Sequence, residues 1–216
     1  MVNFTGGAPT VSGLLVGTGA GEVRLNTGLR AGSGGATLNF APGVLQWMNG
    51  DFEGVQGVLT NAGTITLTGV ENRAARGSFN NAGTFIHDGS ANLQLDNLSG
   101  AEGTGSTLTN LGTGLYVFQS DGGITNGPGD NGTPHLVKNL GTIRKLAGTG
   151  TTRLDPFSVV NDGTIDVRSG TVQFGGRNVS STSGVFTVAA GSIIDLTGSQ
   201  APSYAGRFSG SGAGQI

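Results

Sequence analysis

One short motif recurs along this chain and constrains its fold more than any other feature. An Asn, a variable residue, a Gly and a Thr occur together five times, beginning at Asn61, Asn81, Asn110, Asn139 and Asn161. The successive spacings are 20, 29, 29 and 22 residues, and a degenerate sixth copy begins at Ala189. Units this short cannot each enclose a core, so they must stack and bury their inward residues against one another.

The residues around the motif are typical of strands. An apolar side chain stands two residues before each Asn, and another stands four residues after it in four of the five copies, with Gly114 as the exception. Runs such as 64–68 (Thr-Ile-Thr-Leu-Thr) have the period of two that marks half-buried strands. Within the motif, Asn and Gly tolerate left-handed backbone angles, and Thr restarts an extended segment. Each unit is therefore predicted to be strand, corner and strand.

These observations predict an all-β fold, a right-handed parallel β-helix (β-solenoid) with Asn-x-Gly-Thr corner repeats. Residues 1–216 form a single domain in this prediction, with divergent coils over 1–43, recognisable repeats over 44–200 and the start of a further coil over 201–216. Seven to nine coils about 4.8 Å apart would make a rod roughly 35 to 45 Å long. A β-sandwich is the alternative, although sandwich turns have no reason to repeat one motif. We expect the chain to be a fragment of a longer rod.

The composition excludes several other classes of protein. The chain has no Cys, which excludes a disulfide scaffold and a thiolate metal site. Its 11 Lys+Arg against 13 Asp+Glu leave no basic excess to neutralise nucleic-acid phosphates. No apolar run is long enough for a membrane-spanning helix. The 43 glycines are compatible with disorder, but the alternating β-branched residues favour an ordered fold.

One stretch of the chain resembles a known family. The segment 45–69 places Trp47, Gly54 and Gly57 ahead of the motif that begins at Asn61. This order resembles the coils of large bacterial surface proteins, the autotransporter passengers and filamentous-haemagglutinin-like β-helical adhesins. The resemblance covers residues 40–200. It implies export, a surface or secreted location, and a structural or adhesive role.

Two kinds of site residue follow from the repeat. The five repeated asparagines are predicted to form a structural ladder, with their side chains hydrogen-bonded along the rod inside the corner. The 29-residue spacings exceed the shortest by nine residues, and the excess is expected to leave the rod as loops over 96–106 and 120–135. Loops on a rigid scaffold often carry recognition. On a shared face they would present a polar, acidic, ligand-facing patch of Asp96, Glu102, Asp121, Asp130 and His135.

The sequence offers little for metal or acid–base chemistry. The loop with Asp121 and Asp130 gives a weak possibility of Ca²⁺ binding, but it lacks the spacing and tandem copies of calcium-binding repeats. The acidic residues are scattered, with no adjacent pair of the kind that would suggest glycoside hydrolysis. No other cofactor, no metal ligand set and no catalytic residue is predicted.

Several single residues have competing interpretations. Trp47 is expected to pack in the core or a corner, and would be a sugar-stacking platform if exposed. His87 is expected to face the interior by register with Leu67, whereas a slip of one residue would place Ile86 inside. A solvated outer face is expected for the basic concentration of Lys138, Arg144, Lys145 and Arg153.

The sequence therefore favours a non-catalytic, extracellular rod segment of a bacterial surface adhesin that presents loops to a glycan or cell-surface ligand. Its expected neighbours are further β-helix coils of the same polypeptide, with no nucleic acid and no membrane span. A carbohydrate-active β-helix, which binds or cleaves a polysaccharide, is the alternative. An ice-binding solenoid is third, because rows such as Thr64-x-Thr66 are interrupted by Arg144 and Asp166 in other coils.

Overall fold

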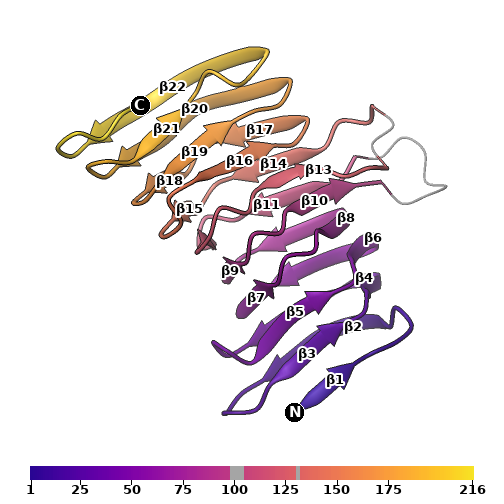
Figure 1. The fold of residues 1–216 in the computed structure, drawn as a ribbon. Coiled ribbons are helices and arrows are strands. Elements are labelled where there is room, and N and C mark those ends of the chain that lie inside the picture. Colours follow the sequence, from indigo (N-terminus) through magenta and orange to yellow (C-terminus); the bar gives the residue numbers. More distant parts are fainter. Residues whose placement is uncertain (98–104, 130–131) are drawn as a thin grey trace.

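The chain folds into a β-solenoid of about nine turns, which confirms the predicted parallel β-helix. The structure is a computed structural model, and it describes residues 1–97, 105–129 and 132–216. In these residues all regular structure is β-strand. Figure 1 shows the coils stacked one on another from β1 to β22, with the two termini at opposite ends of the stack.

Each coil contributes strands to three parallel stacks, which we call A, B and C in chain order. Stack A follows each corner, stack B comes next, and stack C ends at the following corner. All pairings between named strands are parallel and join one coil to the next. Stack A contains β1 (Val2–Phe4), β3 (Val23–Asn26), β5 (Leu45–Asn49), β7 (Thr64–Thr68), β9 (Thr84–Asp88), β12 (Leu115–Phe118), β15 (Thr142–Lys145) and β18 (Thr164–Val167).

The other two stacks share several long strands. Stack B contains β10 (Leu93–Asp96), β13 (Ile124–Asn126), β16 (Thr151–Asp155), β19 (Thr171–Phe174) and β21 (Ile193–Asp195). Stack C contains β11 (Thr107–Asn110), β14 (Leu136–Asn139) and β17 (Ser158–Asn161). Four strands run from stack B into stack C, namely β2 (Thr10–Gly17), β4 (Leu29–Phe40), β6 (Phe52–Asn61) and β8 (Arg73–Asn81). Two run from stack C into stack A, namely β20 (Asn178–Val188) and β22 (Ala201–Gly210).

The core is a set of columns that run along the solenoid axis, because parallel in-register pairing places inward residues directly over one another. In stack A, Ile65 lies under Phe85, Phe85 under Tyr116, and Tyr116 under Ile143. All four side chains are buried. The Phe85 and Tyr116 rings stack with their centroids 4.7 Å apart. Burial of such large side chains is worth roughly 1.5 to 3 kcal/mol each, so the columns supply the main stabilisation of the coils.

The repeated asparagines occupy one column inside the corner, and their amides form a continuous chain of hydrogen bonds. The first four Nδ2 atoms each donate to the Oδ1 of the asparagine in the next coil, over 2.7 to 2.8 Å, and the chain ends at Asn61 Oδ1 and Asn161 Nδ2, which have no partner among the described residues. The same Nδ2 atoms also donate to main-chain carbonyls just after the corner, such as Thr84 O and Thr164 O. The five side chains, which are at most 1% exposed, are those of Asn61, Asn81, Asn110, Asn139 and Asn161. The column therefore satisfies buried polar groups that would otherwise be costly.

The corner glycine has a different role from the one that its sequence suggests. Among the described residues every positive φ belongs to a glycine, but Gly63, Gly83 and Gly141 lie outside that left-handed region. What they lack is space: a Cβ on Gly83 would stand 2.1 Å from Gly63 O, and one on Gly141 would stand 2.3 Å from Gly114 O. Glycine is present because the backbones of successive coils approach closely at the corner.

The third corner also needs a glycine because there is no room for a Cβ, but this glycine lies two residues later than the one in the motif. Leu115 pairs with Thr84 and with Thr142, so Gly114 takes the place that Gly83 and Gly141 hold in the neighbouring coils. A Cβ on Gly114 would lie 2.2 Å from Asn81 O. By contrast, nothing lies within 4 Å of a Cβ on Gly112. Gly114, which breaks the apolar pattern of the sequence, is therefore the corner glycine of this coil.

Two chemically identical substitutions test this account of the corners. Gly83→Ala is expected to destabilise the protein by about 1 to 3 kcal/mol, because the new methyl group meets main-chain atoms that cannot move independently. Gly112→Ala is the matched control, since its site is open, and we expect a change of less than about 1 kcal/mol, in the stabilising direction. Urea unfolding of both variants gives the comparison. Equal losses in the two variants would contradict the close-approach explanation.

Candidate functional site

Most of the extra residues of the two long coils are inserted at one corner, between stacks B and C. Arg76 and Ser78, separated by one residue, pair with Asp96 and Thr107. In the next coil the extra residues lie mostly between 127 and 136, with a shorter extension at 111–114. The first insertion therefore lies where the sequence predicted it. The second occupies only the last part of the predicted 120–135 loop. We call the base of these insertions, formed by Asp96, Asn97, Ser106, Gly127 and His135, the insertion corner.

Ser106 ties the insertion corner together across three coils. Its amide donates to His135 Nδ1 over 2.9 Å, and its hydroxyl donates to Asp96 O over 2.6 Å. The Gly77 amide donates to the same hydroxyl over 2.8 Å. Ser106 and His135 are at most 1% exposed. The described base of the insertions is therefore a hydrogen-bonded part of the coils.

An ion network lies beside this base. Arg76 contacts both Asp51 in the preceding coil and Asp96 in the following one, the latter over 3.2 Å. Arg76 Nε also donates to Asn97 O over 3.2 Å. Burial alone would lower the pKa of Arg76, but the hydrogen bonds and charges of Asp51 and Asp96 raise it above its usual value. One arginine thus holds together two carboxylates from two different coils.

The predicted ligand-facing patch is not assembled as expected. The structure brings Asp96 and His135 together through Ser106, but the two residues are only 3% and 0% exposed and do not face solvent. Asp121 lies at a different corner, between stacks A and B. Glu102 and Asp130 lie outside the described residues. For the described members, the prediction of one acidic face is therefore wrong, because two of them are enclosed by the coils and the third is on another edge.

Asp121 belongs instead to a polar cluster around a buried lysine. Lys145 Nζ donates to Asp121 Oδ1 over 2.7 Å, to Thr152 Oγ1 over 2.9 Å and to Ser120 O over 3.1 Å. The Gly150 amide donates to the same Asp121 oxygen over 3.1 Å. The hydrogen bond from Lys145 lowers the pKa of Asp121 below its usual value. The cluster is a buried ammonium with three acceptors at the rim of the core.

Lys145 also corrects the interpretation of the basic residues. Its side chain is 0% exposed and lies in the interior column between Phe118 and Val167, whereas an outer face was predicted. Arg144, one residue earlier, points outward and pairs with Asp166 over 2.7 Å. The alternation of the strand explains the difference, because neighbouring residues face opposite sides.

The predicted weak calcium site finds no support around Asp121. Its carboxylate already accepts from an ammonium and an amide, which is an unfavourable setting for a divalent cation. In the part of the chain that the structure describes, no three His, Cys, Asp or Glu side chains are grouped so as to hold a metal.

His87 lies in the interior, as its register with Leu67 predicts. Its Nε2 donates to Ala91 O over 2.7 Å, and the Tyr116 hydroxyl donates to Nδ1 over 3.1 Å. Burial lowers the pKa of His87 to about 4, against a usual value of 6.5. His87 is therefore neutral at pH 7 and fully hydrogen-bonded, which is a structural role.

Trp47 is a packing residue. Its side chain is 0% exposed, and its ring stacks on Phe52 with centroids 3.7 Å apart. The indole nitrogen donates to Gly50 O over 2.9 Å. A buried ring cannot stack on a sugar, so the structure assigns Trp47 to the core and excludes the exposed alternative.

The threonine rows on stack A are partial. Thr64 and Thr84 pair in register, but Leu115 follows them before Thr142 and Thr164 continue the column. The neighbouring outward column carries Thr66, Ile86, Val117, Arg144 and Asp166. No regular double row of threonines forms on these coils.

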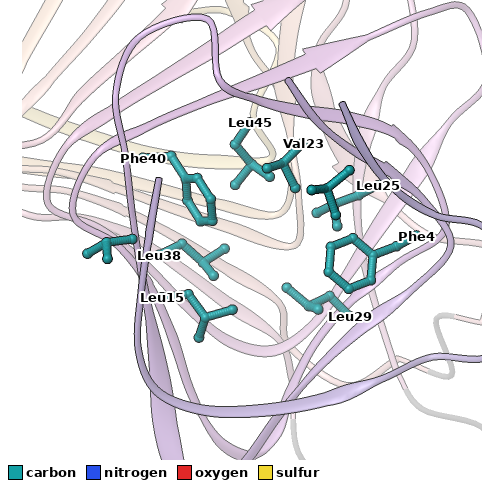
Figure 2. A pocket seen from close by; sticks show the side chains of 10 residues that line it. Phe4, Leu15, Val23, Leu25, Leu29, Leu38, Phe40 and Leu45 are labelled. Atoms are coloured by element: carbon teal, nitrogen blue, oxygen red, sulfur yellow. The ribbon is translucent and has the colours of Figure 1, made fainter. Parts of the chain in front are cut away.

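An apolar hollow lies at the N-terminal end of the solenoid. It has a volume of about 220 Å³ and is lined by ten apolar side chains from the first three coils. Figure 2 shows Phe4, Leu25 and Leu29 on one side of it, with Leu38 and Phe40 on the other. It contains no polar side chain that would orient a small ligand.

Comparisons with known proteins give no further assignment. No protein-family description, no curated protein and no solved structure matches this chain. Across the described residues, no helix has the length and apolar character needed to cross a membrane.

The buried lysine cluster predicts unequal effects of two substitutions. Asp121→Ala leaves the Lys145 ammonium buried without its counter-ion, and we expect a loss of about 3 kcal/mol. Lys145→Met fills the same volume between Phe118 and Val167 and removes the charge, and we expect a change of less than about 1.5 kcal/mol. In Lys145→Met, Thr152 Oγ1 still donates to Ser120 O over 3.3 Å, so neither of these two oxygens is left without a hydrogen-bond partner. Denaturant unfolding tests the order, and a larger loss in Lys145→Met would refute it.

His87 predicts a pH dependence of stability. The folded-state pKa of about 4 lies below the unfolded value of 6.5, so the unfolded state takes up the proton first as the pH falls. The stabilisation is complete above pH 6.5 and decreases through that window by up to about 3 kcal/mol at pH 4. His87→Gln, which keeps a donor for Ala91 O, should show a flatter profile. Parallel slopes for the two proteins between pH 7 and 4 would exclude His87 as the cause.

Proposed function

We propose that this chain is a non-catalytic, extracellular rod segment of a bacterial surface adhesin, which extends its parent protein and presents loops for binding. The observation that carries the proposal is the insertion corner. Two successive coils have most of their extra residues at the same edge of the solenoid, and Ser106 hydrogen-bonds the bases of both insertions to the coils. A hydrogen-bonded base at the start and end of each insertion is the arrangement that loop-borne recognition requires.

The rest of the molecule supports a mechanical role. The parallel pairings run from β1 to β22, so each coil is held by its neighbours along the axis. The polar side chains that the structure places inside, such as Lys145 and His87, are engaged in contacts between coils, and the partly exposed Arg76 also joins neighbouring coils. The similarity of segment 45–69 to adhesin coils supports the surface location and the bacterial origin as parts of the same proposal.

Loop shortening tests where binding resides. Residues 97–106 are replaced by one Gly, which copies the single residue Gly77 between Arg76 and Ser78 in the coil below. The control is Leu140→Ser, a change at a different corner where the side chain is 38% exposed. We expect the parent chain and the control to bind glycans on an array or the surface of bacterial or host cells, and the shortened variant to lose this binding.

The same preparations separate the competing functions. Unchanged binding by a folded, loop-shortened variant would contradict the role of the insertion corner, and absence of binding by the parent chain to any of these surfaces would contradict the adhesive role. Turnover of an acidic polysaccharide, followed by the absorbance of unsaturated products, would replace the proposal with a carbohydrate-active enzyme. Circular dichroism establishes that the variants retain the β fold.

A further inference from the structure

Arg177 is an exposed cation without an acidic partner. Most arginine side chains contact a carboxylate, as Arg30 contacts Glu53 over 2.5 Å and Arg144 contacts Asp166 over 2.7 Å. Across the residues that the structure describes, the Arg177 side chain forms neither an ion pair nor a hydrogen bond, and what it contacts is an aromatic ring. A guanidinium in this state can form strong hydrogen bonds to an external anion.

Phe157, in the coil below, holds this guanidinium in place. Arg177 Cζ lies over the Phe157 ring, 4.9 Å from its centroid. The Arg177 amide donates to Phe157 O over 3.0 Å, so the main chains of the two residues are also joined. A guanidinium on an aromatic face keeps the N–H groups at its edge free, and these form a planar fork that matches a carboxylate. The Arg177–Phe157 pair is therefore oriented for an anion in advance.

The pair lies directly above the base of the second insertion. Phe157 comes between β16 and β17, which stack on β13 and β14 (Figure 1). The Phe157 amide donates to Asn126 Oδ1 over 3.0 Å, at the residue before Gly127. The Ser158 amide donates to His135 O over 2.8 Å. The platform under the guanidinium is thus hydrogen-bonded to both sides of the insertion corner.

Two further cations lie around the same base. Lys138 comes three residues after His135, on the outward side of stack C. Arg153 lies on the outward side of stack B, in the coil of Phe157. Neither forms an ion pair with any residue that the structure describes. Together with Arg177 they belong to three successive coils, about 4.8 Å apart along the axis. An anionic chain along this edge would meet a cation in each coil.

The polar side chains beside the pair suit a ligand that is rich in hydroxyl groups. Ser158 and Asn178 pair in register on the outward side of stack C, directly after Phe157 and Arg177. Asp155, on the outward side of stack B, precedes Phe157 by two residues. Hydroxyl, amide and carboxylate groups donate to and accept from sugar hydroxyls. A few such groups around a planar platform fix the orientation of a ligand.

We infer that the Arg177–Phe157 pair binds a carboxylate of an acidic saccharide. The inference rests on the proposed function, because it names the class of ligand that binds at the insertion corner. The carboxylate accepts hydrogen bonds from the Arg177 guanidinium, while Ser158 and Asn178 contact the sugar hydroxyls. A polyuronate carries one carboxylate on every sugar, so a single chain also reaches Arg153 and Lys138 in the neighbouring coils.

Titration of chain 1–216 with oligogalacturonate, followed by calorimetry, tests the inference. We expect Arg177→Gln to weaken binding more than about 10-fold, because it removes charge-assisted hydrogen bonds. Phe157→Leu should weaken binding about three-fold through loss of the cation–π contact, and Phe157→Tyr, which keeps the ring, should bind like the parent. The control is Arg144→Gln, which removes an outward arginine already paired with Asp166 and should also bind like the parent. Circular dichroism confirms that the variants are folded.

Two other probes test the class of ligand. The methyl ester of the same oligosaccharide lacks the charge and should not bind, and an oligoglutamate of equal charge should bind at least about 10-fold more weakly. Equal binding of either probe would overturn the inference, as would a parent chain that does not bind oligogalacturonate or an Arg177→Gln variant that binds it like the parent. The proposed function fails separately, when the parent chain binds no glycan and no cell surface.

The loop-shortened variant separates the two proposals further. If that variant loses binding to cells while Arg177→Gln keeps it, the insertion corner is adhesive but the carboxylate site is refuted. If Arg177→Gln loses binding and the loop-shortened variant keeps it, the carboxylate site stands and the role of the insertion is refuted.

Discussion

The parallel main-chain pairing between successive coils is the constraint on which the rest of the structure depends. It fixes the axial repeat at about 4.8 Å and places each inward residue over its counterpart in the coil below. At a corner, where two backbones must turn together at that spacing, there is no room for a Cβ on Gly83 or Gly141. The same spacing lets an asparagine amide span from one coil to the next. The glycines at the corners and the stacked columns of the core therefore both result from the spacing between successive coils.

Much of the architecture follows from local patterns in the sequence. Motif spacing indicates stacking, and strand alternation predicts the inward position of His87, whereas the outer face predicted for Lys145 was wrong because its strand alternation places it inside. The glycine requirement is different in kind, because it arises from an adjacent coil and not from the residue's own φ. The motif therefore marks where the corners lie, but it suggests the wrong reason for its glycine: a left-handed φ instead of a close approach to the adjacent coil.

The candidate site is less accessible to sequence reasoning, because it depends on which residues meet across coils. Asp96 is buried because Arg76, from the preceding coil, and Ser106, from beyond an insertion, both contact it. Asp121 lies at a separate corner, between β12 and β13, where it contacts Lys145 from the next coil. Spacing gives the length of an insertion but not the residue at which it begins. The length of the second long coil is shared between two places, at 111–114 and after residue 127, which only the strand register reveals.

The single occurrences of His87 and Lys145 have a consequence for how the chain avoids misfolding. Repeated coils of similar sequence are prone to pair out of step, with one coil skipped. In such an arrangement Lys145 would enter an apolar column without Asp121, and His87 would lose the Tyr116 hydroxyl. These polar side chains therefore distinguish their own coils from the others and penalise pairings in which the coil of Asp121 or of Tyr116 is skipped.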